Sequence, residues 1–280
     1  MNTLEPQLGL DVCSVFFDGM LTDPQLDHPE GIAIQADGSV WCGGERGQIF
    51  RIEPDGSAME QVASTGGFCL GLAFGPAGDL YVCDVKHAAV MRVDVQTGAV
   101  ETFADGASGR RMRNPNFPAF DADGRLYVSD SNAMHEPGPG IYRFLPDGGG
   151  ELWYARDVNF ANGLALAPDD ASLFVAETFS GRVFRVPIEP DGSAGEREEL
   201  FEAPGVLLDG LAFGDDDTLY VACYHPSQIL VVPPPYSEPR VLVRDDEAHL
   251  LCHPTNVTLR GRTLLAANLG RWHVTAVTLP

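Results

Sequence analysis

The chain has 280 residues, a formal net charge of −22 and a mean hydropathy of −0.05, and 44% of its residues are hydrophobic. This composition is typical of a folded protein with a hydrophobic core, and its charge argues against nucleic acid or an anionic membrane surface as partner. The six cysteines include no close Cys-x-x-Cys pair, which argues against a zinc ribbon or a thioredoxin-type motif.

The N-terminal residues Met-Asn-Thr-Leu-Glu-Pro have neither the basic start nor the apolar run of a signal peptide. No apolar stretch approaches the length that spans a membrane. We therefore expect a cytoplasmic protein whose cysteines are buried free thiols. The oligomeric state is left open.

The first predicted strand, Leu10-Asp-Val-Cys-Ser-Val-Phe-Phe17, is rich in β-forming residues. After it, a unit of two strands joined by a turn occurs six times, most clearly in Asn162-Gly-Leu-Ala-Leu-Ala-Pro-Asp-Asp-Ala-Ser-Leu-Phe-Val-Ala-Glu177. The first residues of the six copies stand at positions 30, 70, 116, 162, 209 and 255, which are 40, 46, 46, 47 and 46 positions apart. A period of this length with several strands per copy is typical of a β-propeller, so six copies predict six blades.

Each full copy adds a third and a fourth strand, such as Ile141-Tyr-Arg-Phe-Leu145 and Glu151-Leu-Trp-Tyr-Ala155. The last copy ends after its third strand, His273-Val-Thr-Ala-Val-Thr-Leu279. The strand at residues 10–17 would then supply the missing fourth strand, and the ring would close by pairing of the N- and C-terminal strands. We predict an all-β fold in which residues 1–280 form a single six-bladed β-propeller domain with four antiparallel strands per blade.

The six first residues of the copies, called the leading residues below, should surround the central channel at one height. They are Glu30, Leu70, Asn116, Asn162, Asp209 and Thr255. Four of them bear carboxylate or amide oxygens, which would repel and desolvate one another in a channel without a cation. Oxygen ligands favour a hard cation. We therefore predict one divalent cation, with calcium as the best match and zinc, manganese or magnesium as alternatives; a hydrated polar channel is the competing hypothesis.

The residues two positions earlier form a second ring. They are His28, Phe68, Asn114, Phe160, Leu207 and His253. In extended segments these side chains point the same way as the leading ones, and a following proline favours an extended conformation for the two histidines. We expect this ring to line the pocket wall, with each histidine either as a hydrogen-bonded wall residue or in proton transfer.

The ends of the second strands supply further polar side chains. They include Asp84, Asp130, Glu177 and Asn268. Their expected role is to anchor loops by accepting hydrogen bonds from backbone amides, with metal binding as an alternative role for Asp130. The segment 131–140 is expected to be either a lid over the mouth or an ordinary connection.

With these residues in place, the chain resembles the senescence-marker-protein/gluconolactonase family of six-bladed β-propeller hydrolases over nearly its whole length. The most specific marks are Pro29-Glu-Gly31, Ala161-Asn-Gly-Leu-Ala-Leu-Ala-Pro-Asp169, Leu208-Asp-Gly-Leu211 and Pro254-Thr-Asn-Val257. In that family a Glu, an Asn and an Asp bind one divalent cation, and they correspond to Glu30, Asn162 and Asp209. A further family Asn, which contacts substrate or metal, corresponds to Asn116.

The resemblance also bears on the substrate. Sugar-lactonase members have an Arg two residues before that last Asn, whereas this chain has Asn114 there with Arg113 beside it. A sugar-acid lactone is therefore one option among several. The candidate substrate-binding residues are Arg113, Asn114, Asn116, Phe68 and Phe160.

The resemblance implies a metal-dependent hydrolase of lactones or related esters that acts on a small molecule. The cation would polarise the carbonyl, and Asp209 would take a proton from the attacking water. The alternatives for this step are water activated by the cation itself, or His28 or His253 as the base.

Two other functions fit parts of the sequence. Propellers similar to diisopropylfluorophosphatase use a Glu, two Asn and an Asp, so a phosphotriester or fluorophosphate hydrolase is the second hypothesis. A non-catalytic propeller that binds a protein or peptide is the third. Strictosidine-synthase-like propellers share the fold without this metal set.

Overall fold

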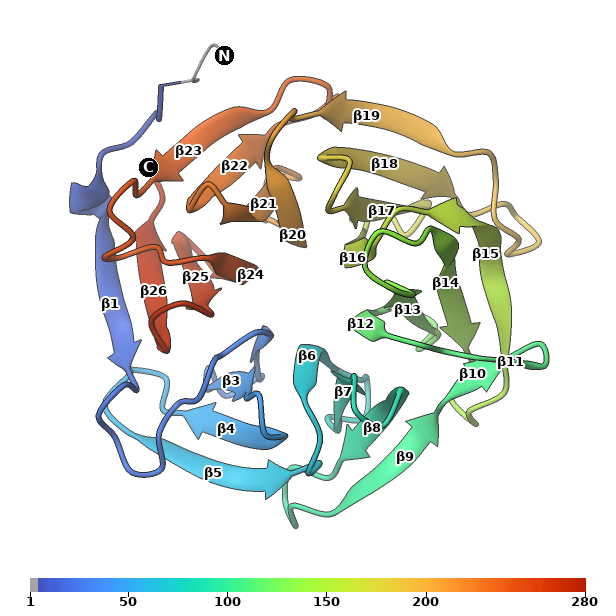
Figure 1. Ribbon diagram of the computed structural model, residues 1–280, viewed down its shortest axis with the longest axis horizontal. Coiled ribbons are helices and arrows are strands. Elements are labelled where there is room, and N and C mark those ends of the chain that lie inside the picture. Colours follow the sequence, from blue (N-terminus) through green and yellow to red (C-terminus); the bar gives the residue numbers. More distant parts are fainter. Residues whose placement is uncertain (1–4) are drawn as a thin grey trace.

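The computed structural model describes residues 5–280, and residues 1–4 of the expected domain and N-terminus lie outside the described residues. Six four-stranded antiparallel sheets stand as blades around a central axis (Figure 1). The prediction of an all-β, six-bladed propeller is therefore confirmed. Within the described part of the chain the helical structure is one 3-10 turn, η1 (Leu10–Val12), and no helix is long and apolar enough to cross a membrane.

The strands of each blade are given in order from the axis outward. Blade 1 contains β2 (Ile32–Ile34), β3 (Val40–Gly43), β4 (Gln48–Ile52) and β5 (Met59–Ser64), and blade 2 contains β6 (Cys69–Phe74), β7 (Leu80–Asp84), β8 (Ala89–Val93) and β9 (Val100–Ala104). Blade 3 contains β12 (Pro115–Phe120), β13 (Leu126–Asp130), β14 (Gly138–Phe144) and β15 (Gly150–Val158), and blade 4 contains β16 (Ala161–Leu166), β17 (Ser172–Glu177), β18 (Arg182–Pro187) and β19 (Glu198–Glu202). Blade 5 contains β20 (Leu207–Phe213), β21 (Leu219–His225), β22 (Gln228–Val232) and β23 (Arg240–Arg244), and blade 6 contains β24 (Pro254–Arg260), β25 (Thr263–Asn268), β26 (His273–Thr278) and β1 (Cys13–Asp18). A short hairpin, β10 (Gly106–Ala107) with β11 (Arg110–Arg111), was not predicted.

The ring closes through the N-terminal strand. β1 pairs antiparallel with β26, from Cys13 opposite Val277 to Asp18 opposite His273. The predicted closure is confirmed, but the strand occupies residues 13–18 instead of 10–17, because η1 takes up the residues before it. Upstream, the backbone amides of Gln7 and Leu8 donate to carbonyl oxygens of β23 at 2.9 Å, so the N-terminal segment joins blade 5 to blade 6.

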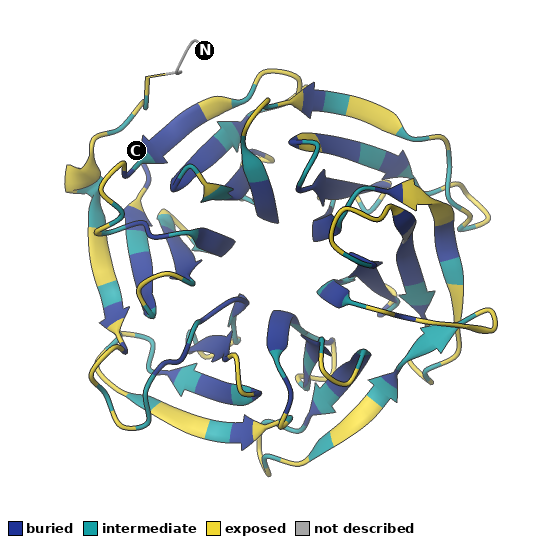
Figure 2. Cartoon of the chain, in the orientation of Figure 1, coloured by how far each residue is buried: buried dark blue, intermediate teal, exposed yellow. Residues whose placement is uncertain are grey.

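The hydrophobic core lies between neighbouring sheets. The second strands, such as β13 and β17, are buried along their whole length, whereas outer strands such as β9 consist mostly of exposed and half-buried residues. A strand that is covered on both faces needs a continuous apolar sequence, and an outer strand does not. Figure 2 shows the consequence, with exposed residues concentrated on the outer strands and in the turns. All six cysteines are free and five of them are buried.

Glycine after a leading residue lets neighbouring inner strands approach closely. A Cβ added to Gly71 would lie 2.7 Å from the carbonyl oxygen of Asn116, and one on Gly163 would lie 2.4 Å from that of Asp209. Real Cβ atoms essentially never come within 3.0 Å of another heavy atom. The recurring glycine therefore allows the inner strands, and the leading residues with them, to come together at the axis.

Candidate metal and active site

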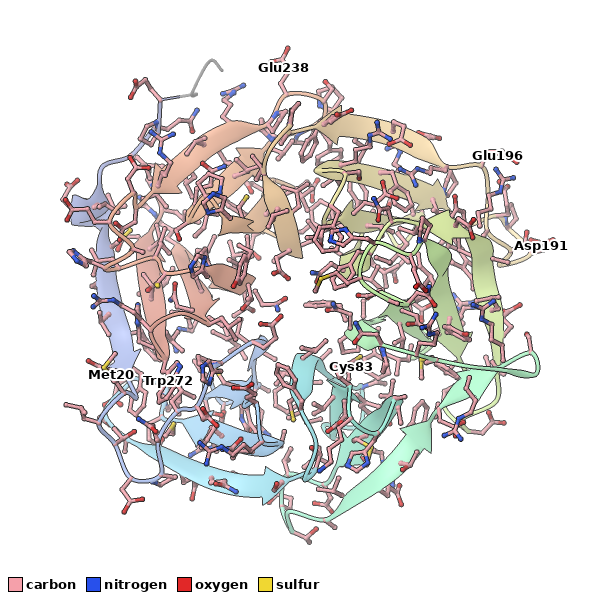
Figure 3. The ribbon with its side chains drawn as sticks, in the orientation of Figure 1. Met20, Cys83, Asp191, Glu196, Glu238 and Trp272 are labelled. Atoms are coloured by element: carbon pink, nitrogen blue, oxygen red, sulfur yellow. The ribbon has the colours of Figure 1, made fainter. Side chains whose placement is uncertain are left out.

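The six leading residues enter the inner strands of the six blades, and all six are buried. The four that bear carboxylate or amide oxygens, Glu30, Asn116, Asn162 and Asp209, are between 3% and 7% exposed. Figure 3 shows side chains from the inner strands extending toward the axis of the ring. The structure therefore brings the predicted acids and amides into the buried inner wall of the propeller.

Three of these residues have an oxygen without a partner. Among the described residues, no group donates a hydrogen bond to the buried Oδ1 atoms of Asn116, Asn162 and Asp209. The amide nitrogens of the two asparagines are satisfied, because Asn116 Nδ2 donates to Ser131 Oγ at 2.9 Å and Asn162 Nδ2 donates to Thr178 Oγ1 at 3.1 Å. A buried acceptor without a partner costs about 1–3 kcal/mol. Three such oxygens on adjacent blades indicate a site that binds a positively charged or hydrogen-donating group.

The two acids of the set favour their neutral forms. Burial raises the pKa of the Glu30 carboxyl to about 8, although a hydrogen bond from Thr255 acts in the opposite direction. Burial and then the charge of Glu30 raise the pKa of Asp209 well above its usual value, against a hydrogen bond from Asn162. Within residues 5–280 no Lys, Arg or His nitrogen forms an ion pair with either acid. A divalent cation would compensate both charges, and the oxygen donors fit a hard ion.

In the metal-free protein, this pair of acids makes the free energy of unfolding depend on pH. An unfolded chain releases both protons near pH 4, whereas the fold retains them until the pH passes about 8 for Glu30. Stability in chelator is therefore greatest below the unfolded pKa and should fall as pH rises from about 5 to about 8. Calcium should remove this fall, because it favours the ionised acids.

Urea denaturation in chelator across that pH range measures the effect. Glu30→Gln is the matched variant, and its profile should be flatter, since it removes one acid and the charge that acts on the other. A wild-type profile that is flat between pH 5 and pH 8 would contradict the coupling described here.

The second ring lies nearer to solvent than the leading residues. Its six members are all partly exposed, whereas the leading residues are buried. The expectation of extended histidines is wrong, because His28 and His253 have left-handed φ values of 48° and 52°. Phe160, the second-ring residue of blade 4, also has a left-handed φ of 63°, so this conformation is not confined to the histidines. His28 Nδ1 lies 2.8 Å from Asp27 Oδ1, and His253 Nδ1 lies 2.8 Å from the Tyr224 carbonyl oxygen. These contacts engage Nδ1 of both imidazoles.

Asp130 acts as a loop anchor. Its carboxylate accepts hydrogen bonds from the backbone amides of Arg113, Asn114 and Asn132 at 2.8 to 2.9 Å. The structure thus supports the anchoring role over the metal-binding one for this residue. Glu177 accepts in the same way from the Asn159 amide at 2.7 Å.

The candidate substrate-binding residues near Asp130 differ in their surroundings. Asn114 Oδ1 is buried and has no hydrogen-bond partner among residues 5–280. The Arg113 guanidinium is half-exposed and lies 3.3 Å from both Asn132 Oδ1 and Glu136 Oε2. Arg113 is therefore held by the loop that follows β13.

That loop packs against the next blade. His135 lies 4.5 Å from Phe179 between ring centroids, and Phe179 lies 4.9 Å from Phe160 of the second ring. Asn132 Nδ2 also donates to the Glu136 carbonyl oxygen at 3.0 Å. The loop thus extends from blade 3 to Phe179 of blade 4, which in turn packs against Phe160.

Sequence reasoning missed three residues near the site. Asn256 is 1% exposed, its Nδ2 donates to the Glu30 carbonyl oxygen at 2.9 Å, and its Oδ1 has no partner among the described residues. The pattern Thr255-Asn256 could have indicated it. Asp27 and Glu45 were also missed, and a carboxylate oxygen of each lies within 2.9 Å of His28 Nδ1. The three side chains form a cluster of residue types that can bind a metal ion. The His28 ring also lies 4.5 Å from the ring of Trp272, which is labelled in Figure 3.

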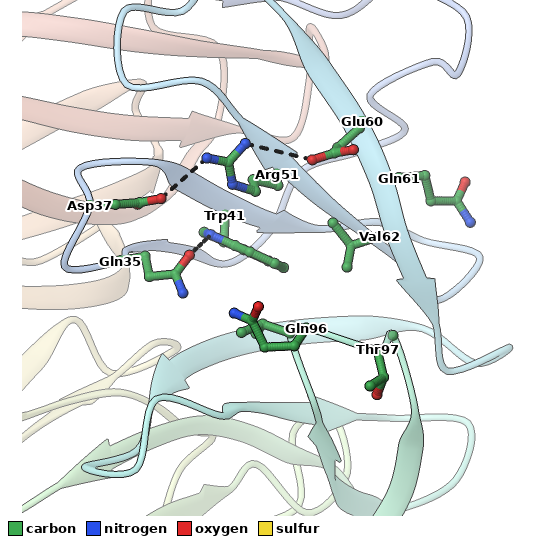
Figure 4. A pocket seen from close by; sticks show the side chains of 11 residues that line it. Gln35, Asp37, Trp41, Arg51, Glu60, Gln61, Val62, Gln96 and Thr97 are labelled. Atoms are coloured by element: carbon green, nitrogen blue, oxygen red, sulfur yellow. Dashed lines mark hydrogen bonds and ion pairs between the residues drawn. The ribbon is translucent and has the colours of Figure 1, made fainter.

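A cavity of about 500 Å³ lies elsewhere, between blades 1 and 2 (Figure 4). Its walls come from the β2–β3 and β8–β9 turns, which lie on the rim opposite to the segments that enter the inner strands. Arg51 in this cavity pairs with Asp37 at 3.2 Å and with Glu60 at 3.6 Å. The cavity contains none of the predicted site residues, so we do not assign the site to it.

Fold and site together define a six-bladed β-propeller with a buried set of acids and amides on its inner strands. The family model of the SMP-30/Gluconolactonase/LRE-like region matches residues 59–238, which is 180 of the 280 residues, and the chain belongs to this family. A second model, for the N-terminal part of strictosidine synthase-like proteins, matches residues 20–52.

Individual relatives are distant. Protein STRICTOSIDINE SYNTHASE-LIKE 6 of Arabidopsis thaliana is 28% identical over 216 residues, which cover 70% of this chain and 56% of that protein. A gluconolactonase of Zymomonas mobilis is 31% identical over 118 residues, which cover 39% of this chain and 33% of that protein. The chain thus spans between a third and just over half of these relatives. The structure of a gluconolactonase from Xanthomonas campestris superposes with a TM-score of 0.79 at 20% identity, covering 96% of this chain and 89% of that one, which shows the shared fold.

Proposed function

We propose that the protein is a calcium-dependent hydrolase of lactones or related esters. The observation that supports this proposal is the set of three unpartnered buried oxygens, on Asn116, Asn162 and Asp209, beside the buried acid Glu30. In a hydrated polar channel without a cation, burial would keep the two acids in their neutral forms, whereas a divalent cation would use both as charged ligands. Membership of the gluconolactonase family and the name of the Zymomonas mobilis relative point to the same class of reaction.

The roles follow from the positions of the side chains. A bound calcium ion would polarise the carbonyl of the substrate and stabilise the negative charge that develops on its oxygen. Glu30 and Asp209 supply the two negative charges of the site, and Asn116 and Asn162 supply neutral oxygens. Asn116, Asn162 and Asp209 lie on inner strands and Glu30 lies two residues before one, which limits their movement during turnover.

We assign Asp209 as the base that takes the proton from the attacking water. Its carboxylate is close enough to Glu30 and Asn162 to interact with both, so a water bound to a cation held by these residues would lie near it. His28 and His253 stay as alternatives, and because their Nδ1 atoms are engaged, proton transfer by either would use Nε2.

The second ring would contact the substrate. Phe68, Phe160 and Leu207 supply apolar wall, and Asn114 supplies an amide with an unpartnered oxygen. Because Arg113 is held by Asn132 and Glu136, the wall suits a neutral lactone with an apolar portion better than a strongly anionic sugar acid. We also propose that residues 1–280 work as one domain in the cytoplasm on a small-molecule substrate, without nucleic acid or membrane.

Hydrolysis assays test this function. Purified protein, stripped with chelator, is offered sugar lactones, simple γ- and δ-lactones, a phenyl ester and a phosphotriester, with calcium, magnesium, manganese or zinc restored separately. We expect turnover of at least one lactone that is lost in chelator and recovered with calcium. Turnover of the phosphotriester alone would favour the second hypothesis, and absence of any metal-dependent turnover would contradict the proposal.

A further inference from the structure

The side-chain amides of Asn116 and Asn162 each donate a hydrogen bond to a buried hydroxyl group. Ser131 Oγ accepts from Asn116 Nδ2 at 2.9 Å and donates to the Ala161 carbonyl oxygen at 2.7 Å. Thr178 repeats this arrangement one blade later, where Oγ1 accepts from Asn162 Nδ2 at 3.1 Å and donates to the Leu208 carbonyl oxygen at 2.7 Å. In both cases the carbonyl belongs to the residue directly before the next leading residue.

This arrangement decides which way each amide faces. A hydroxyl group has a single proton to donate, and here that proton is used on a backbone carbonyl of the next blade. The hydroxyl oxygen is left only as an acceptor, so the neighbouring asparagine must present its NH₂ group to it. The amide oxygen then occupies the opposite side, which is where Asn116 Oδ1 and Asn162 Oδ1 have no partner. Without the hydroxyl, either side of the amide could face the axis.

A comparison of the six blades supports a specific role. The strand pairings place one equivalent residue at the end of the second strand of every blade or just beyond it. In order from blade 1 to blade 6, these residues are Glu45, Val85, Ser131, Thr178, Tyr224 and Leu269. An aliphatic hydroxyl thus occurs at this position only in the two blades whose leading residue is asparagine. A general need to link neighbouring blades would have placed one in the other blades as well.

We propose that Ser131 and Thr178 are positioning residues that hold the oxygens of Asn116 and Asn162 toward a divalent cation at the propeller axis. This inference rests on the proposed function for the existence of the cation. Removal of such a supporting group typically weakens metal binding about 10–100-fold. The hydroxyl also ties each amide to the strand that bears the next leading residue, so Asn162 and Asp209 are linked through Thr178.

Calcium titration calorimetry on three single variants tests the proposal. Thr178→Val keeps the shape of the side chain and removes the hydroxyl, whereas Thr178→Ser keeps the hydroxyl and removes a methyl group. We expect the calcium dissociation constant to rise about 10–100-fold in Thr178→Val and to stay within about threefold of wild type in Thr178→Ser. If the residue only filled space, Thr178→Ser would be the more harmful change.

Thr275→Val is the matched control. Thr275 is also buried, accepts from an asparagine amide (Asn268 Nδ2, 2.9 Å) and donates to a backbone carbonyl, that of Leu250. However, Asn268 Oδ1 is already bonded to the Cys252 amide at 2.8 Å. Thr275→Val should therefore lower the melting temperature in chelator as Thr178→Val does, but leave the calcium dissociation constant within about threefold of wild type.

Combining Thr178→Val with Asn162→Asp separates the orientation of the amide from other effects of losing the hydroxyl group. In Asn162→Asp the side chain presents an oxygen on both sides, so Thr178→Val should weaken calcium binding several-fold less there than in the wild-type background. Equal losses in the two backgrounds would contradict the proposal. If Thr178→Val fails to fold, Ser131→Ala provides the same test at Asn116.

The outcomes separate the two levels of inference. A wild-type protein that releases no heat with calcium, and whose melting temperature does not respond to it, lacks the proposed cation site, and the positioning role falls with it. If Thr178→Val and Ser131→Ala bind calcium as tightly as the wild-type protein does, the positioning role is refuted and the proposed function stands.

Discussion

Asp209→Asn is expected to lower the turnover of a simple lactone by about 100-fold or more, even when calcium is raised to saturation. The substitution keeps an oxygen at the buried site but removes the group that takes a proton from water. It also removes one of the two negative charges, so calcium binding weakens as well. Lactone hydrolysis is measured across a calcium titration, with bound calcium determined in parallel.

Glu30→Gln is the matched comparison for this experiment. It removes the other buried charge and leaves the proposed base in place. Its turnover should therefore recover in part once calcium saturates the site, because its main defect is low occupancy. Equal recovery of both variants would exclude Asp209 as the base and point to water activated by the cation, or to His28 or His253.

Deletion of residues 1–18 is expected to lower the melting temperature by about 10 °C or more. The deletion removes β1 and exposes the edge of β26. It also removes Phe17, which is 8% exposed and packs in the core cluster of blades 1 and 6, and the bonds of residues 7 and 8 to β23. Thermal melting monitored by circular dichroism measures the effect.

Deletion of residues 1–6 is the control, because it leaves β1 and the bonds of Gln7 and Leu8 in place. That shorter deletion should melt close to the parent protein. If the variant without residues 1–18 also melts like the parent protein and keeps the parent's oligomeric state, closure of the ring by the chain ends is unimportant for stability.

The number of blades could be predicted from the sequence because every blade repeats the same short sequence pattern. A leading residue, a glycine that permits close approach and a buried strand recur with a near-constant period, as at Asn162-Gly163. The chain ends were also informative, since the last copy lacked a strand. The exact start of β1 was missed, because the β-forming residues Leu10 and Val12 lie in a 3-10 turn.

The oxygen-bearing leading residues could be identified because equivalent positions of a repeat meet at the axis. The histidine conformations could not, since the proline after each histidine favours an extended backbone, whereas φ at His28 and His253 is left-handed in the fold. The arrangement at Ser131 was also out of reach. Its carbonyl partner, Ala161, lies 30 residues away in the next blade, and only the packing of blades brings them together.

A crystal structure of the protein with calcium, with an anomalous difference map, tests the central claim most directly. We expect one peak on the propeller axis, about 2.3–2.6 Å from oxygens of Glu30, Asn116, Asn162 and Asp209. No peak there at saturating calcium, or a peak only at the cluster of Asp27, His28 and Glu45, would contradict the account.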